Sequence, residues 1–515
     1  MQEVPRLASP TRDDAATGTA GGGLLGLFSR GVAWKVGAQS ISQTARLVAT
    51  IVLVHLLAPS AYGLAAMALV LAGFAVAFSD LGFGAALVQR PILTSVDIST
   101  AFWISLAAGA AFTVLTALAA VPLAEAYAQP RAAALILGLS PIFVLDSLAT
   151  TQRALLARKV DFRSLELRSL VGAVVGSSVA IGAALDGAGA WSLIVQELVT
   201  AVASTLLLWR LASWRPSFAF SRQSCRDLGG FAWRSMGTRL LNDVNDTADN
   251  VLVGRFLGAG PLGIYTVTYK TALRPMANFI RPLQEVVFPV LSLAQDDVRL
   301  VAQAWLRVTR ITSALTFPLL AGVAVLAPEF VHVVLGGRWA SAATVLQILT
   351  IVGAIQALTA TIWSVLGALN QIKTSLRLAG ARTALNVTAF AVGLHWGIKG
   401  VAAAYAASSV VTFVPIVWLT SRRVGLPVMA SFRVLGGVSQ ATAVMSLALV
   451  LFRRLAIDEG MGASLRLVTL IAAGGAVYGV TLWWRDRALR DDVLRLVGSW
   501  WPRSAAPLAS PRAVP

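Results

Sequence analysis

Long apolar segments recur along this chain and limit what it can fold into. We count about fourteen of them in 515 residues, each near the ~20 residues that a helix needs to cross the hydrocarbon core of a bilayer. Only helices and closed barrels satisfy their backbone hydrogen bonds in lipid, and the alternating pattern of barrel strands does not occur here. The segments therefore predict an all-α, polytopic membrane protein. They start near Val32, Ala61, Thr100, Ala132, Leu165, Ala190, Phe231, Leu262, Trp305, Ala342, Leu376, Gly400, Val434 and Leu465.

The low content and the distribution of charged residues also indicate a membrane protein. Charged residues make up 13% of the chain, against about 25% in a soluble protein, and the mean hydropathy is +0.74. The formal net charge of +18 would suggest nucleic acid in a soluble protein. Here the lysines and arginines concentrate in every second connection, including the basic stretch 153–168, which we interpret as a loop, and the stretch 210–226. This asymmetry predicts that both termini are cytoplasmic and that the basic excess meets membrane lipids rather than nucleic acid.

Several classes of site are not indicated. The single cysteine, Cys225, excludes an intramolecular disulfide and a thiolate metal cluster. Residues 1–30 lack the apolar core of a cleavable signal peptide, so we expect the first span to direct insertion. Phosphate-binding loops and zinc-protease or serine-hydrolase motifs do not occur, and the loops outside the membrane are short. We therefore expect a transporter rather than an enzyme, with no metal and no bound cofactor.

An internal repeat divides the chain. The motif Gly31-Val-Ala-Trp34-Lys35 recurs about 200 residues later as Gly230-Phe-Ala-Trp233-Arg234, and the stretch 57–64 recurs as 257–264. Six predicted helices separate the copies, which predicts two six-helix lobes in a parallel pseudo-twofold repeat, an arrangement that suits alternating access. The expected domains are an N-terminal tail (1–30), an N-terminal lobe (31–213), a cytoplasmic linker (214–230), a C-terminal lobe (231–425), helices 13 and 14 (426–486) and a C-terminal tail (487–515).

The segment 231–285 is unusual because it is charged inside the membrane. It predicts two helices joined by a turn at Gly258–Pro261. On the first helix Arg239, Asp243, Asp246 and Asn250 follow a single helical stripe. Lys270, Arg274 and Arg281 form a similar stripe on the second helix. A charge at the centre of a membrane helix costs about 2.5–3.5 kcal/mol, so such residues usually face protein or a hydrated path.

Two interpretations of these charges stay open. Residues at equal depth in the hairpin would pair as Asp243 with Arg274 and Asp246 with Lys270, which makes them structural ion pairs. Buried pairs are expensive to desolvate and contribute little net stability, so several of them together favour a polar translocation path instead.

The first predicted helix carries one further intramembrane cation. Gln39, Gln43 and Arg46 share a helical stripe. Asp80 on the second helix is predicted to lie level with Ala38, within reach of Lys35, whereas Arg46 lies level with Ala72. We expect Arg46 to face a hydrated cavity or an anionic ligand, with pairing to a distant helix as the alternative. The helices from 100 to 211 are rich in small apolar residues and are expected to be packing elements.

Short motifs spread over residues 25–490 resemble those of the Wzx-type polysaccharide flippases. These belong to the multidrug/oligosaccharidyl-lipid/polysaccharide exporter (MOP) superfamily. The motifs are Gly31-Val-Ala-Trp34, Leu57-Ala-Pro-Ser-Ala-Tyr-Gly63, Asp80-Leu-Gly-Phe-Gly-Ala-Ala-Leu-Val-Gln89, Gly189-Ala-Trp191-Ser-Leu-Ile-Val-Gln196 and Leu262-Gly-Ile-Tyr265. The resemblance implies fourteen helices, a central cationic cavity, and movement of undecaprenyl-pyrophosphate-linked oligosaccharide across the bacterial inner membrane without ATP hydrolysis by the chain itself. Its implied role is exopolysaccharide or O-antigen (lipopolysaccharide) assembly.

The resemblance also implies site residues. The related peptidoglycan-precursor flippases use cavity arginines on the first and eighth helices, which points to Arg46 and Arg274. Arginines and lysines bind phosphate groups, so the expected pyrophosphate-binding set is Arg46, Lys270, Arg274, Arg281 and Arg239. Asp243, Asp246 and Asp249 would couple transport to a proton or sodium gradient, or pair with these cations. Trp34, Trp233, Tyr265 and Tyr269 would stack on sugars or anchor helix ends.

Partners and alternatives follow from the same resemblance. The implied partners are the lipid-linked substrate, membrane lipids, a polysaccharide polymerase and chain-length or export machinery. One alternative is a cation-coupled multidrug exporter of the same superfamily, although the cationic stripes favour an anionic substrate. The other is a membrane polysaccharide ligase or polymerase, which would need catalytic loops outside the membrane.

Overall fold

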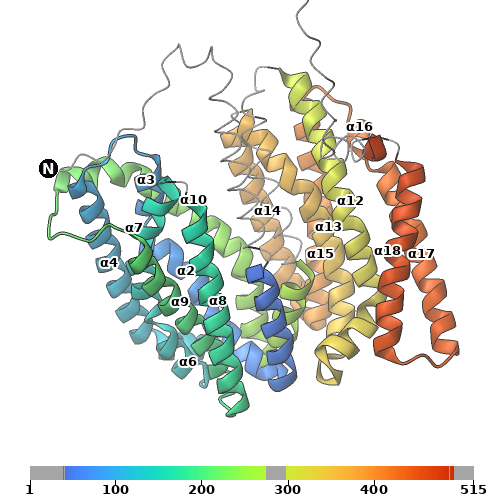
Figure 1. Cartoon of the computed structure of the whole chain (residues 1–515), viewed down its shortest axis with the longest axis horizontal. Coiled ribbons are helices and arrows are strands. Elements are labelled where there is room, and N and C mark those ends of the chain that lie inside the picture. Colours follow the sequence, from blue (N-terminus) through green and yellow to red (C-terminus); the bar gives the residue numbers. More distant parts are fainter. Residues whose placement is uncertain are drawn as a thin grey trace, which may run out of the picture. The chain divides into compact units, whose positions relative to one another are not determined.

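The computed structural model describes residue 39 and residues 41–159, 161–273, 291, 297–369, 371–486 and 488–491. Every regular element in this part of the chain is a helix (Figure 1). The prediction of an all-α membrane protein is therefore confirmed. Arg274 and Arg281, the two predicted site residues in the stretch 274–290, lie outside the described residues, as do Trp34 and Lys35.

Ten segments of the described chain are long and apolar enough to cross a membrane, judged by length and composition alone. The charged helix α10 (Arg222–Leu257) is not among them. The total of fourteen helices stays a prediction. The ten are Pro59–Asp80, Ser95–Leu118, Ala132–Arg158, Phe162–Leu185, Trp191–Leu211, Val298–Leu335, Ala342–Ala368, Lys373–Arg423, Gly436–Asp458 and Ala463–Arg485.

The chain divides into two compact units, and the first ends at Gly263. In this unit α8 packs along α9, while α7 packs against α2, α4 and α9, and α10 contacts α2 and α3. Its helices are Ile41–Leu56, α2 (Pro59–Asp80), α3 (Phe83–Gln89), α4 (Ser95–Leu118), α5 (Ala120–Ala126), α6 (Ala132–Leu139), α7 (Ile142–Arg158), α8 (Phe162–Leu185), α9 (Trp191–Leu211) and α10.

The motif at Asp80 separates α2 from α3. Leu81 and Gly82 both have positive φ, 47° and 80°, which breaks the helix. A Cβ on Gly82 would overlap the carbonyl of Ala232 in α10, so only glycine allows this close approach. The Asp80 carboxylate accepts the backbone N–H of Gly84 at 2.5 Å, which fixes the start of α3.

The repeated motif 57–64/257–264 forms a reciprocal backbone crossing. A Cβ on Gly63 would overlap the carbonyl of Ala259 and lie 2.8 Å from its Cα. A Cβ on Gly263 would likewise overlap the carbonyl of Pro59 and lie 2.9 Å from the nitrogen of Gly63. Gly63 and Gly263, and Pro59 and Ala259, are equivalent positions of the repeat. A twofold relation between the two hairpins produces this kind of reciprocal contact.

The second unit begins at Ile264. Within it α13 packs between α12 and α15, α14 packs on α15, and α17 and α18 run side by side (Figure 1). Its helices after residue 297 are α12 (Val298–Phe330), η1 (Val331–Leu335), η2 (Gly337–Trp339), α13 (Ala342–Ala368), α14 (Ile372–Gly393), η3 (Leu394–Trp396), α15 (Gly397–Arg423), α16 (Val428–Arg433), α17 (Gly436–Asp458) and α18 (Ala463–Arg485).

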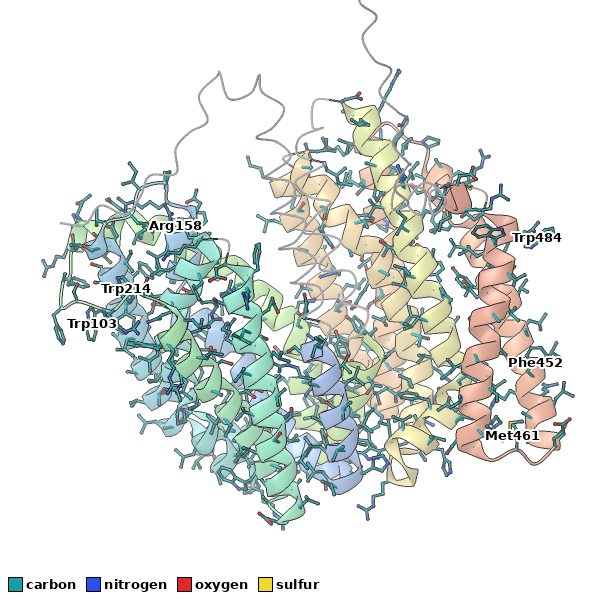
Figure 2. All side chains as sticks on the ribbon, viewed as in Figure 1. Trp103, Arg158, Trp214, Phe452, Met461 and Trp484 are labelled. Carbon is teal, nitrogen blue, oxygen red and sulfur yellow. The ribbon has the colours of Figure 1, made fainter. Side chains whose placement is uncertain are left out.

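Ion pairs connect α17 and α18 to α12. Glu329 of α12, whose side chain is 2% exposed, pairs with Arg453 of α17 at 2.6 Å and with Arg466 of α18 at 3.5 Å. Toward the other end Arg310 of α12 lies 3.8 Å from Asp486. The pair carries exposed apolar side chains, among them Phe452 and Trp484, which Figure 2 labels, as expected where helices face lipid.

About half of the predicted linker 214–230 is helical, because α10 begins at Arg222. Ser221 caps this helix by accepting the N–H of Ser224. The short stretch before α10 is held on α4: the indole of Trp103 donates to the carbonyl of Ser217 at 2.8 Å and stacks on Phe218. Figure 2 shows Trp103 and Trp214 on the same side of this unit. By contacts α10 belongs with the first unit, whereas the lobe boundaries proposed from the repeat stay a prediction.

Candidate functional site

The charged stripe of α10 forms on one continuous helix. Asp243 lies close enough to Arg239 and to Asp246 for each to influence its charge, as the i, i+4, i+7 spacing requires. The Asp243 side chain is half-buried, and its Oδ2 is buried without a hydrogen-bond partner among the described residues. A buried, unpaired carboxylate oxygen is costly, which makes Asp243 the carboxylate of the stripe with the greatest need of a proton, a cation or a donor.

The other two aspartates of the stripe differ from Asp243. Asp246 is exposed and accepts the side-chain amide of Asn245 at 3.2 Å. Asp249 is buried, and one of its oxygens accepts the backbone N–H of Asn250 at 2.7 Å. The proposed roles of all three in ion coupling or charge pairing stay predictions.

Arg239 binds a carboxylate that the sequence did not assign to it. Its guanidinium lies 3.4 Å from Asp80, whose side chain is 8% exposed, while 47% of the Arg239 side chain is exposed. The pair ties α10 to the end of α2. The sequence pattern predicts Asp80 near Lys35, which lies outside the described residues. Because Arg239 is half-exposed, it can hold Asp80 and still present N–H groups to a ligand.

The structure describes two of the remaining predicted cations. Arg46 is half-buried on the helix Ile41–Leu56, and its carbonyl accepts the hydroxyl of Thr50. Lys270 is half-buried on the helical stretch 259–273. Its proposed pairing with Asp246 stays a prediction, and the pairing of Asp243 with Arg274 falls outside the described residues.

One aromatic expectation is wrong for this structure. Tyr265 is fully buried, with 0% of its surface exposed, so its ring is not available to stack on a sugar. Trp233 by contrast is largely exposed and keeps both of its predicted roles.

A second charged group lies where packing elements were expected. Asp146 and Arg153, one above the other on α7, form an ion pair at 3.3 Å with side chains 22% and 28% exposed. Both lie close enough to Asp80 to act on it electrostatically. On α8, Arg168 is half-buried and lies near Arg153, Asp146, Glu166 and Arg46.

The expected basic loop 153–168 is thus wrong, because α7 extends to Arg158 and α8 begins at Phe162. Arg158, the last residue of α7, holds this helix end against the end of α3 and the residues that follow it. Its guanidinium donates to the carbonyls of Leu87 at 3.2 Å and Pro91 at 2.6 Å, and also to that of Arg90. Figure 2 shows Arg158 at this end of the unit. The i, i+7 spacing of Asp146 and Arg153 was the available signal that both lie on one helical face.

No group of three or more histidine, cysteine, aspartate or glutamate side chains suited to a metal ion occurs in the described part of the chain. The described charged side chains offer electrostatic chemistry, because arginines on the helices pair with carboxylates and have further N–H groups that can bind a ligand.

Comparison with known proteins gives consistent matches. The family profile described as "Polysaccharide biosynthesis protein" matches residues 52–344. The teichuronic acid biosynthesis protein TuaB of Bacillus subtilis is 26% identical over 79% of this chain and 84% of its own length. The succinoglycan biosynthesis transport protein ExoT of Rhizobium meliloti is 26% identical over 93% of this chain and 97% of its own. The lipopolysaccharide biosynthesis protein WzxC of Escherichia coli is 26% identical over 70% of this chain and 74% of its own length.

Solved structures show the same fold. The lipid II flippase MurJ, in an inward closed conformation, superposes with a TM-score of 0.73 at 14% identity, over 89% of this chain and 99% of that one. An inward-facing multidrug resistance MATE transporter of the MOP superfamily superposes with a TM-score of 0.61 at 16% identity, over 76% of this chain and 98% of that one. The expected MOP-type membrane fold is confirmed.

Proposed function

Because the chain belongs to the polysaccharide biosynthesis protein family, we propose that it is a flippase for lipid-linked oligosaccharide. The substrate is an undecaprenyl-pyrophosphate-linked oligosaccharide, moved across the bacterial inner membrane for exopolysaccharide or O-antigen assembly. The chain is a multi-pass membrane protein of a transporter fold, so we do not propose the ligase or polymerase alternative.

The observation that carries the proposal is the placement of two arginines on helices of the first unit. Arg46 is half-buried on the apolar helix Ile41–Leu56, and Arg239 lies on the charged helix α10 with 47% of its side chain exposed. A cation inside the membrane is stable only beside an anion or water, and a pyrophosphate supplies negative charges that arginine binds with paired N–H donors. The names of three relatives, which refer to teichuronic acid, succinoglycan and lipopolysaccharide, support a polysaccharide precursor as the substrate.

The proposed mechanism is alternating access with a cationic cavity. The pyrophosphate binds to Arg46, Arg239, Lys270, Arg274 and Arg281, the sugars follow it through the protein, and the lipid tail remains in the bilayer. The repeat-related crossing of Gly63 and Gly263 supports a twofold design, in which two similar halves alternate between two arrangements.

A proton or sodium gradient supplies the driving force in this proposal. Asp243 is the leading carboxylate, because its Oδ2 is buried without a hydrogen-bond partner among the described residues and gains most from a proton or cation. Asp246 and Asp249 are the further candidates. The chain works in the inner membrane with both termini cytoplasmic, and it delivers substrate to a polymerase and to chain-length or export machinery.

A cation-coupled multidrug exporter is the second candidate. The likeness to a MATE transporter and the aspartates of α10 favour it. The arginines of the first unit weigh against it, because they would repel cationic drugs.

The location of the substrate tests the proposal. Cells deleted for the gene are treated with a label that reaches only the outer leaflet of the inner membrane. Intact, unlabelled lipid-linked oligosaccharide on the cytoplasmic side is the expected result. Normal labelling, in a strain without a second flippase of this family, would refute the proposal and lead to drug-efflux assays.

A further inference from the structure

Four polar side chains inside the first unit have no role in the function proposed so far. Ser79 of α2, Ser105 of α4, and Thr151 and Gln152 of α7 are each 0% exposed. Their three hydroxyl oxygens and both amide atoms of Gln152 are buried without a hydrogen-bond partner among the described residues. Buried polar atoms nearly always have a partner in folded proteins, so this group on three neighbouring helices needs a common explanation.

The hydroxyl of Thr151 does not use the acceptor that a helix normally offers. A serine or threonine inside a helix can donate to the carbonyl three or four residues earlier. Ser147 and Thr150 of the same helix do so, to Val144 at 2.8 Å and to Asp146 at 3.0 Å. The hydroxyl of Thr151 has no such bond among the described residues and is therefore available to a ligand between the helices.

The three helices α2, α4 and α7 all pack against one another, and two contacts fix the direction of α4 relative to α7. The hydroxyl of Thr113 donates to the carbonyl of Ser140 at 3.1 Å. Earlier on α4 and later on α7, a Cβ on Gly109 would lie 2.5 Å from the hydroxyl of Ser147. The two helices therefore run antiparallel. Ser105 and Thr151 each lie one helical turn beyond this second contact, in the same direction.

A hydrophobic cluster places Ser79 at the same level. The cluster includes one residue near each of the three hydroxyls, namely Phe83, Ala101 and Ala154. Ser79 lies four residues before the first of them, Ser105 four after the second, and Thr151 three before the third. The end of α3 meets the end of α7 at Arg158, so α2 and α7 approach the cluster from the same side. All three hydroxyls thus lie about one turn from the cluster, toward the interior of the unit.

The donors and acceptors indicate which ligand fits. The amide nitrogen of Gln152 only donates and its oxygen only accepts, whereas each hydroxyl does both. A metal cation would bind the oxygens and leave the amide nitrogen unpaired. The ion pairs at this end of the unit, Asp80 with Arg239 and Asp146 with Arg153, leave no excess negative charge for a cation. Water satisfies donors and acceptors alike and makes about three hydrogen bonds in a buried site.

We propose that α2, α4 and α7 enclose a buried hydration site, in which ordered water bridges Ser79, Ser105, Thr151 and Gln152. The site lies beside the break between α2 and α3, where the last carbonyl groups of α2 need partners outside the helix. Interrupted helices are tolerated in membrane proteins where ordered water and neighbouring hydroxyls supply such partners. The water thereby stabilises the break that positions Asp80.

The sign of one substitution tests the site. Gln152→Met keeps the length of the side chain and removes its polar atoms. In a dry junction this change removes two unpaired polar atoms and should raise the unfolding temperature of the purified full-length protein. In a hydrated site it takes partners from the bridging water and should lower that temperature. An unchanged or raised unfolding temperature would overturn the proposal.

A double-mutant cycle separates shared water from poor packing of the methionine. Ser105 and Gln152 lie on different helices and have no direct hydrogen bond to each other. If water bridges them, Ser105→Ala with Gln152→Met should lower the unfolding temperature by less than the sum of the single changes. Ser140→Ala is the control partner, because the hydroxyl of Ser140 donates to the carbonyl of Leu137 at 2.8 Å, and its effect should add to that of Gln152→Met. Additive effects in both cycles would contradict a shared ligand.

X-ray radiolytic labelling with mass spectrometry detects the water itself, because radicals formed from a bound water modify the side chains around it. We expect modification within the buried stretch 147–156 of α7 in the unchanged protein and in Ser140→Ala, and loss of most of it in Gln152→Met. An unmodified stretch in the unchanged protein would show a dry junction and refute the site. The cation alternative is tested with sodium chloride against choline chloride at equal ionic strength. A rise in unfolding temperature that is specific to sodium and lost in Gln152→Met would replace water by a cation and overturn the proposal.

Discussion

The crossing of Gly63 and Gly263 allows a quantitative prediction. Apolar atoms pack at about 3.5–4.0 Å, whereas a Cβ on residue 63 would lie 2.8 Å from the Cα of Ala259 and overlap its carbonyl. The contact with the Ala259 Cα alone requires the two helices of the Gly63→Ala variant to move apart by about 0.7 Å, and the overlap with the Ala259 carbonyl requires a larger displacement. Overpacking of this kind costs about 1–3 kcal/mol, and we expect the upper end because main-chain atoms must move. Alanine is about 1 kcal/mol more favourable than glycine inside a helix, so the free energy of unfolding should fall by about 2 kcal/mol in total.

Thermal unfolding in detergent measures this loss. Gly237→Ala is the matched control, because Gly237 lies in α10 of the same unit and its added Cβ would meet nothing within 4 Å. The control should unfold at the same or a higher temperature, and Gly63→Ala at a lower one. Gly263→Ala should resemble Gly63→Ala, and the double variant should lose less than the sum, because the first alanine has already opened the crossing. Wild-type stability in Gly63→Ala, or full additivity of the pair, would refute the reciprocal crossing.

Four further predictions concern single side chains. Glu329→Gln leaves two arginines without their buried carboxylate and should cost about 3–5 kcal/mol, seen as early thermal unfolding, whereas an unchanged melting curve would show that the pair with Arg453 contributes no stability. Arg158→Gln removes charged hydrogen bonds to main-chain carbonyls and should cost about 2 kcal/mol, measured by the same assay against the exposed control variant Arg210→Gln. Arg46→Ala should abolish polysaccharide export while protein levels stay near normal, and parallel loss of the folded protein would favour a structural role. Asp249→Asn should weaken the dependence of export on the ion gradient, and an unchanged dependence would remove Asp249 from coupling.

Local patterns in the sequence predicted the fold class and the stripe of α10. Apolar segments near the length of a bilayer leave helices as the only solution, and the i, i+4, i+7 spacing places Arg239, Asp243 and Asp246 together whatever the rest of the chain does. The repeat was also visible in the motifs around Gly63 and Gly263. The direct contact between these two glycines could not be predicted. It depends on how the backbones of two hairpins 200 residues apart are placed, and only that placement shows why both positions lack a side chain.

Ion pairs between segments far apart in the chain could not be predicted from the sequence. Asp80 and Arg239 are 159 residues apart, and depth arithmetic within a single hairpin can only propose partners from neighbouring helices, such as Lys35. The error at Arg153 and Arg168 has a different cause. Both lie near helix ends, where a hydropathy window averages a charged helical turn with the loop beside it and assigns the basic residues to the loop.

Asp80 connects the two charged groups of the first unit. Its carboxylate holds the start of α3 through Gly84, pairs with Arg239 of α10, and lies within electrostatic reach of Asp146 and Arg153 of α7. One carboxylate at a helix break thus connects α2, α3 and α10 and lies near the ion pair of α7. A change of charge at any of these positions acts at the place where these helices meet.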